Sequence, residues 1–82
     1  METRKEIATR LIAKIKRDTG KLFTMDQAFH FADFAAKEFN VLISLRNNRL
    51  SIVIFNYCDF KDHKVTRDDF IELLAWYRRS FK

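Results

Sequence analysis

The sequence contains no proline, one glycine and one cysteine, and each scarcity excludes a class of protein. With Cys58 alone, no intramolecular disulfide is possible, whereas small secreted domains usually depend on several such bridges. We therefore expect a reducing, cytoplasmic location. Gly20, the one glycine, cannot form a glycine-rich loop that cradles phosphates, and the composition leaves no flexible linker.

Long hydrophobic runs are also missing. No apolar stretch approaches the roughly 20 residues that a membrane-spanning helix needs, and the charged N-terminus lacks the apolar segment of a secretory signal. We therefore expect no membrane partner. The 82 residues, of which 48% are hydrophobic, suit a single compact domain, 1–82, with one modest core.

The stretch 41–56 has the pattern of a β-hairpin. Two β-branched, apolar runs flank a polar turn, in which Asn47 and Asn48 tolerate the positive φ that a two-residue turn demands. Counting outward from the turn places Ile43 opposite Ile52, and slipping the pairing by one residue would mix apolar with polar side chains. One face then becomes wholly aliphatic and comprises Val41, Ile43, Leu45, Leu50, Ile52 and Ile54.

Three further segments have the capping and periodicity of helices. A Thr followed three residues later by Glu, Gln or Asp satisfies the first free amides of a helix, and such pairs begin at Thr3, Thr24 and Thr66. Gly20 and Asn40 suit the left-handed position that ends the first two helices. Each segment carries an apolar stripe at helical spacing. In the last helix the expected stripe is Phe70, Leu73, Leu74, Tyr77 and Phe81.

The segment 57–65 shows no hydrophobic periodicity, and we expect an irregular connector there. The predicted fold is therefore α+β in the order helix, helix, strand, strand, helix. A two-stranded antiparallel hairpin would pack against three helices, because a lone hairpin is not stable in water.

Motifs for catalysis and metal binding are weak. The segment 59–70 has the rhythm of half a calcium loop, but His63 occupies the position that needs glycine. Cys58 and His63 offer only a sparse zinc pair, and no spacing supports His30 and His63 as the acid and base of a nuclease. We expect no catalytic residue, no metal and no cofactor.

Cations gather in two places. The total of 16 Lys and Arg against 11 Asp and Glu gives a net charge of +5, which favours nucleic acid or an acidic protein surface as partner. A cationic ridge follows one side of the first helix and comprises Arg10, Lys14, Arg17 and Lys21. Such a ridge predicts either a solvated face or a contact with anions.

The second basic group is the hairpin tip, where Arg46 and Arg49 flank Asn47 and Asn48 and should face each other. Guanidinium and amide groups bind phosphates and base edges, so the tip is a candidate nucleic-acid contact. Charged turns also keep hairpins from aggregating, and that role alone could explain these residues.

The sequence thus favours a small, basic, non-enzymatic nucleic-acid-binding or adaptor protein that uses the cationic ridge and the hairpin tip. The alternative is a small regulatory protein that docks on another protein through its basic face and two aromatics, Phe34 and Trp76. For either function we expect a monomer or a weak homodimer.

Overall fold

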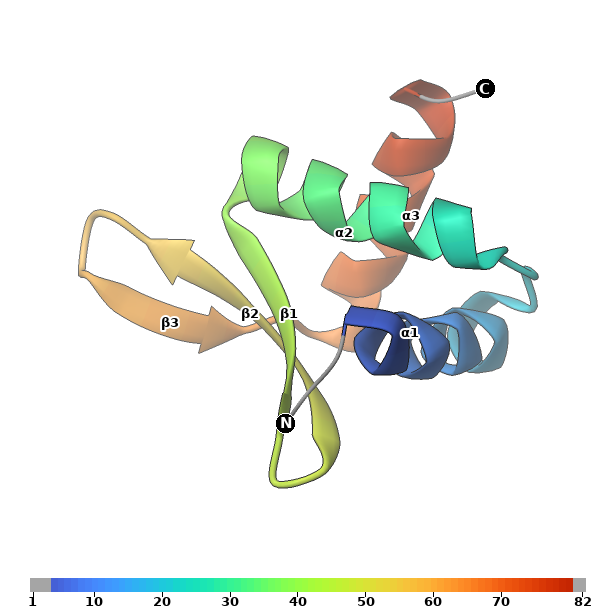
Figure 1. Cartoon of the computed structure of the whole chain (residues 1–82). Helices are drawn as coiled ribbons and strands as arrows, with labels where there is room; N and C mark the ends of the chain where they lie inside the picture. Colours follow the sequence, from blue (N-terminus) through green and yellow to red (C-terminus); the bar gives the residue numbers. More distant parts are fainter. Residues whose placement is uncertain (1–3, 81–82) are drawn as a thin grey trace.

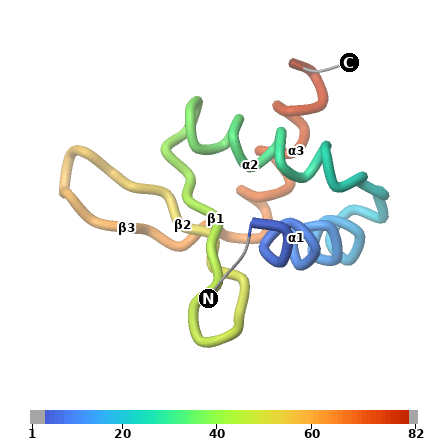
Figure 2. Tube along the Cα trace, in the orientation of Figure 1, coloured from blue at the N-terminus to red at the C-terminus, as the bar shows by residue number. Residues whose placement is uncertain are grey.

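The computed structural model describes residues 4–80 and has the predicted α+β architecture. The elements are α1 (Arg4–Thr19), α2 (Met25–Phe39), β1 (Val41–Arg46), β2 (Arg49–Asn56), β3 (Lys61–Lys64) and α3 (Arg67–Ser80). The strands form one antiparallel sheet in the order β1-β2-β3. Figure 1 shows the helices gathered on one side of this sheet. The two turns of the sheet point in different directions (Figure 2).

The β1–β2 hairpin has the predicted register, with Ile43 opposite Ile52. Its turn residues, Asn47 and Asn48, have φ angles of 49° and 63°, as a two-residue hairpin turn requires. Asparagine adopts this left-handed conformation more readily than most residues, because its short polar side chain bonds locally. Local turn chemistry and the apolar pattern therefore select the same pairing.

The aliphatic face of the hairpin packs against α1 and α2. Val41, Leu45 and Ile52 are buried there, whereas Ile43 and Ile54 are only half-buried. The helices therefore cover the aliphatic face unevenly, and Ile52 is its most buried member on β2.

Strand β3 corrects the expectation of an irregular connector and of a two-stranded sheet. It pairs with the second half of β2, so that Val53 lies opposite Lys64 and Asn56 lies opposite Lys61. Every residue of β3 is exposed. The alternation of apolar and polar residues that reveals a half-buried strand in a sequence is therefore missing here.

Side-chain hydrogen bonds shape the turn between β2 and β3. The Oδ1 atom of Asn56 accepts from the backbone N–H of Cys58 at 2.8 Å, and Oδ1 of Asp59 accepts from that of Lys61 at 3.2 Å. Phe60 takes the left-handed conformation, with φ of 55°. Asn and Asp close turns in this way, so these two residues were the available signal for the hairpin.

The helices begin at the predicted caps wherever the structure describes them. Thr24 Oγ1 accepts from the N–H of Gln27 at 3.2 Å, and Gln27 Oε1 accepts from the N–H of Thr24 at 2.9 Å. Thr66 Oγ1 accepts from the N–H of Asp69 at 3.2 Å. The predicted cap at Thr3 lies outside the described residues.

Helices α1 and α2 also end as predicted. The N–H of Gly20, whose φ is 75°, donates to the carbonyl oxygen of Lys16 at 2.8 Å and closes α1. Asn40 closes α2 with a φ of 55° and donates its N–H to the carbonyl oxygen of Ala35. Both residues sit in the left-handed conformation that satisfies the last carbonyl groups of a helix.

The core lies where the helices meet, and Phe31 of α2 is at its centre. The ring of Phe31 is edge-on to Phe70 at 5.8 Å and to Tyr77 at 5.4 Å, measured between centroids. Leu11 of α1 is completely buried beside them. The predicted stripe of α3 is confirmed from Phe70 to Tyr77, and Phe81 lies outside the described residues.

Candidate functional site

The tip of the β1–β2 hairpin meets the cationic ridge of α1. Nη1 of Arg10 donates to the backbone oxygen of Asn48 at 2.9 Å, and Nη2 donates to Oδ1 of the same residue at 3.0 Å. These residues are 38 positions apart in the chain. The two basic groups that the sequence shows separately are therefore parts of one surface.

A hollow of about 460 Å³ lies between α1, the first half of β2 and the end of β3. Five of its lining residues are cationic and none is acidic, which makes its potential positive. We call it the basic cleft, defined by the cations Arg10, Lys14, Arg17, Arg49 and Lys64.

The basic cleft exists because β3 pairs with only half of β2. The ladder between them ends at Val53, and one further bond joins the N–H of Val65 to the carbonyl oxygen of Ile52 at 3.0 Å. The backbone N–H and C=O groups of successive residues in an antiparallel strand point to alternate sides. Those of Leu50 therefore point to the same side as the carbonyl oxygen of Ile52. Leu50 lines the basic cleft. A backbone donor and a backbone acceptor of Leu50 therefore both face this side.

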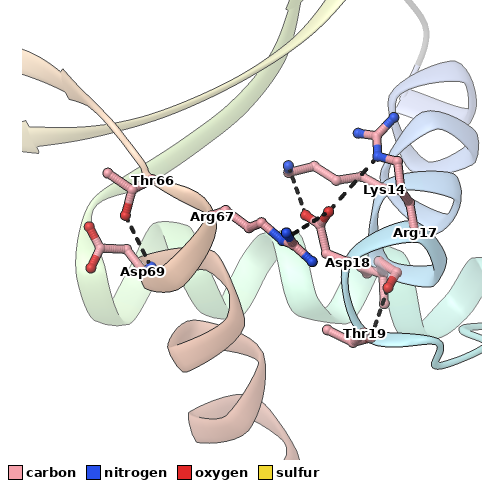
Figure 3. A network of polar contacts seen from close by, with 8 residues as sticks. Lys14, Arg17, Asp18, Thr19, Thr66, Arg67 and Asp69 are labelled. Atoms are coloured by element: carbon pink, nitrogen blue, oxygen red, sulfur yellow. Dashed lines mark hydrogen bonds and ion pairs between the residues drawn. The ribbon is translucent and has the colours of Figure 1, made fainter.

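Asp18 forms ion pairs with three cations beside the basic cleft (Figure 3). Its carboxylate lies 3.0 Å from Nζ of Lys14, 3.9 Å from Nε of Arg17 and 3.7 Å from Nε of Arg67. The Asp18 side chain is only 7% exposed, whereas those of Arg17 and Arg67 are 73% and 67% exposed. One carboxylate balances one of three charges, so the cluster keeps an excess of positive charge.

Lys14 has a second fixed contact. Its Nζ atom lies 4.9 Å from the centre of the Phe70 ring, in the position of a cation–π interaction. Together with the bond to Asp18, this contact holds the ammonium group in place. Lys14 therefore contributes a positioned charge, whereas the charge of Arg17 lies on a side chain that is mostly exposed.

Some predicted cations lie elsewhere. Lys21 follows the end of α1 and lines a separate hollow with Arg78 of α3, so the ridge does not continue past the helix. Arg46 faces Arg49 across the turn, as predicted, and is exposed together with Asn47. Of this pair only Arg49 lines the basic cleft.

Three charged residues of this region, Asp18, Lys64 and Arg67, were not predicted from the sequence. Lys64 and Arg67 reach the cleft region because β3 returns the chain to α1, and that strand was not predicted. Asp18 lies four residues after Lys14, a spacing that brings side chains together on a helix. This spacing was the available signal.

The two candidate docking aromatics differ in exposure. Phe34 is half-buried, with its ring 5.7 Å from that of Phe39 and 5.6 Å from that of Tyr77, so it helps to join α2 to α3. Trp76 is 46% exposed, and the guanidinium carbon of Arg79 lies 5.4 Å from its ring centre. Trp76 therefore presents more surface to a partner.

Neither a metal cluster nor a membrane span is found among residues 4–80. The described His, Cys, Asp and Glu side chains form no group of three or more that could hold an ion. Nε2 of His63 and Oδ2 of Asp59 lie 2.9 Å apart as a pair, and Cys58 is an exposed free thiol. The described helices include none that is both long and apolar enough to cross a bilayer.

The basic cleft offers guanidinium and ammonium groups, with no carboxylate among its lining residues. These are the groups that proteins use to bind phosphate oxygens. Comparisons of the chain with protein families, with curated protein sequences and with solved structures find no match.

Proposed function

We propose that this protein is a small, non-enzymatic nucleic-acid-binding protein that holds backbone phosphates in the basic cleft. The observation that carries the proposal is the convergence of cations from two distant parts of the chain. Arg10, Lys14 and Arg17 come from α1, whereas Arg49 and Lys64 come from the sheet. A concave, cationic surface concentrates the field that attracts a polyanion.

The geometry supports contact with phosphates more than with base edges. Arg10 is committed to Asn48 and Lys14 to Asp18, so they supply fixed positive charge rather than free donors. Contacts to phosphates position a nucleic acid but carry no sequence information. The proposed binding is therefore dominated by charge and has little sequence preference.

We propose a binding protein rather than an enzyme. The residues that line the basic cleft include no His, Cys, Asp or Glu, the side chains that most often transfer protons or attack substrates in enzymes. We further propose a cytoplasmic location, because the chain has one cysteine and reducing compartments keep thiols free.

A second candidate function is docking on an acidic protein surface through Trp76 and the basic face. The observation that favours it is the exposed pair of Trp76 and Arg79 on α3. Tryptophan and arginine are enriched among the residues that dominate protein interfaces. In that case Trp76→Ser would weaken partner binding and leave nucleic-acid affinity unchanged.

The test is an affinity measurement by fluorescence anisotropy with labelled DNA and RNA oligonucleotides at low salt. The cleft variant carries Arg17→Gln, Arg49→Gln and Lys64→Gln, all at exposed side chains. A matched control carries three changes at other exposed side chains, which lie outside the basic cleft, Lys16→Gln, Lys37→Gln and Arg78→Gln. Both variants lower the net charge of +5 by three.

We expect the cleft variant to bind at least about tenfold more weakly than the wild type, since each exposed ion pair contributes up to about 1 kcal/mol. The control variant should stay within about threefold of the wild type, because its charges act only over long range. Equal losses of affinity in both variants would mean that net charge, and not the basic cleft, determines binding. If the wild type binds neither DNA nor RNA, the docking alternative replaces this proposal.

A further inference from the structure

The face of the sheet that points away from the helices carries apolar and basic side chains together. Side chains alternate along a strand, and residues paired across strands share a face. The observed pairing therefore places one set opposite to the aliphatic face. We call this set the open face, defined by Leu42, Ser44, Arg46, Arg49, Ser51, Val53, Phe55, Asp62 and Lys64.

An aromatic pair stands at the far end of the open face. The rings of Phe55 and Tyr57 have centroids 4.8 Å apart and planes at 90°. Phe55 is half-buried, whereas Tyr57 is 64% exposed, and Leu42 on the same face is 55% exposed. The edge-to-face contact fixes the Tyr57 ring and leaves much of its surface open to a ligand.

The charges on the open face are mainly positive. Arg49, Arg46 and Lys64 belong to it, and Asp62, which pairs with Phe55, is the carboxylate that shares it. Arg49 and Phe55 are six residues apart on β2, or roughly 20 Å at the rise of a strand. Arg49 and Lys64 also line the basic cleft, so the open face and the basic cleft share these two residues.

We propose that the open face binds single-stranded nucleic acid, with bases stacked on Tyr57 and Phe55 and the backbone running toward Arg49 and Lys64. This inference rests on the proposed function and narrows it to one class of nucleic acid. Bases in a duplex are already stacked on their neighbours, so only unpaired bases offer their faces to an aromatic ring. The positive charge beside the rings suits an anionic strand.

The experiment compares a 12-nucleotide oligo(dT) with a 12-base-pair duplex and with a 12-unit abasic strand, all measured by fluorescence anisotropy. Tyr57→Ala removes the exposed ring, and Tyr57→Phe is the matched variant that keeps it. Leu22→Ala controls for the loss of an exposed apolar side chain outside the open face, since Leu22 is 74% exposed. Thermal melting of each variant checks that the fold is intact.

Stacking of one base predicts that Tyr57→Ala binds oligo(dT) about fivefold more weakly or worse. Tyr57→Phe and Leu22→Ala should match the wild type, and the affinities of Tyr57→Ala for the duplex and for the abasic strand should be unchanged. An oligonucleotide with 2-aminopurine should lose fluorescence on binding the wild type and lose less on binding Tyr57→Ala.

Two results would overturn the inference while the proposed function stands. In the first, Tyr57→Ala binds oligo(dT) as tightly as the wild type, while the cleft variant Arg17→Gln, Arg49→Gln, Lys64→Gln still loses affinity. In the second, Tyr57→Ala loses affinity for single strand, duplex and abasic strand alike. If the wild type binds none of the three ligands, the proposed function fails as well.

Discussion

The guanidinium group of Arg10 donates two hydrogen bonds to Asn48, at 2.9 Å to the backbone oxygen and at 3.0 Å to the side-chain oxygen. Asn48 itself is held in the left-handed conformation by the hairpin turn. This contact fixes the hairpin tip against α1. The parts of the basic cleft that come from α1 and from the hairpin therefore keep one relative position. Such preorganisation reduces the conformational entropy that is lost on binding.

Replacing Ile52 by Asp should unfold the protein. Ile52 is 7% exposed on the aliphatic face, and an unpaired carboxylate there would cost more than about 4 kcal/mol. A chain of this length has a stability of roughly 4–12 kcal/mol, so little would remain. Circular dichroism and urea unfolding measure the loss. Ile52→Val should cost only about 1 kcal/mol, and a native-like Ile52→Asp would contradict the register.

Asp18→Asn should destabilise the fold by about 1–3 kcal/mol, because it removes the largely buried counterion of a cation cluster. The carboxylate is within 4 Å of Lys14, Arg17 and Arg67, and the distances are 3.0, 3.9 and 3.7 Å. Urea unfolding at low and high salt measures the effect, which should shrink as salt screens the cations. Asp62→Asn, at an exposed strand position, should change stability by less than about 0.5 kcal/mol. Equal effects of the two changes would argue against a structural role for Asp18.

Alkaline pH should destabilise the protein through Tyr77. Burial raises the pKa of the Tyr77 hydroxyl above its usual value of 10.0. The folded state therefore holds this proton more tightly than the unfolded state, so the stabilisation is complete below pH 10 and is lost as pH rises through the folded pKa. Urea unfolding from pH 8 to 11 should show a steeper loss for the wild type than for Tyr77→Phe. Identical pH profiles would exclude this linkage.

Chelation should leave the fold unchanged. Cys58 is an exposed free thiol, and no described group of three or more metal-binding side chains surrounds it. A structural metal would contribute to folding free energy, and its removal would lower the melting temperature. We expect equal melting curves with and without EDTA, and reaction of Cys58 with a thiol reagent in the folded protein. A lower melting temperature in EDTA would indicate a metal at the β2–β3 turn.

The hairpin could be predicted because its signals are local. Asn47 and Asn48 supply the turn, and the flanking residues sort by face in a single register. The helix caps at Thr24 and Thr66 are local in the same sense. Strand β3 lacks the apolar alternation, because all of its side chains are exposed, and only the turn residues Asn56 and Asp59 give a local signal for its pairing with β2.

The basic cleft could be predicted only in parts. Arg10, Lys14 and Arg17 recur on one side of a helix, and this pattern is visible in the sequence. Their meeting with Arg49 depends on how α1 packs across the hairpin, which no local pattern encodes. Lys64 joins them only because β3 exists.

The salt dependence of duplex DNA affinity tests the central claim, binding of phosphates in the basic cleft, most directly. Each phosphate that a cation neutralises adds about −0.9 to the slope of log K against log salt concentration. The cations of the basic cleft therefore predict a slope of roughly −3 to −5 for the wild type, and removal of Arg17, Arg49 and Lys64 predicts about −1 to −2. A wild-type slope near zero, or an equal slope in this triple variant, would contradict the claim.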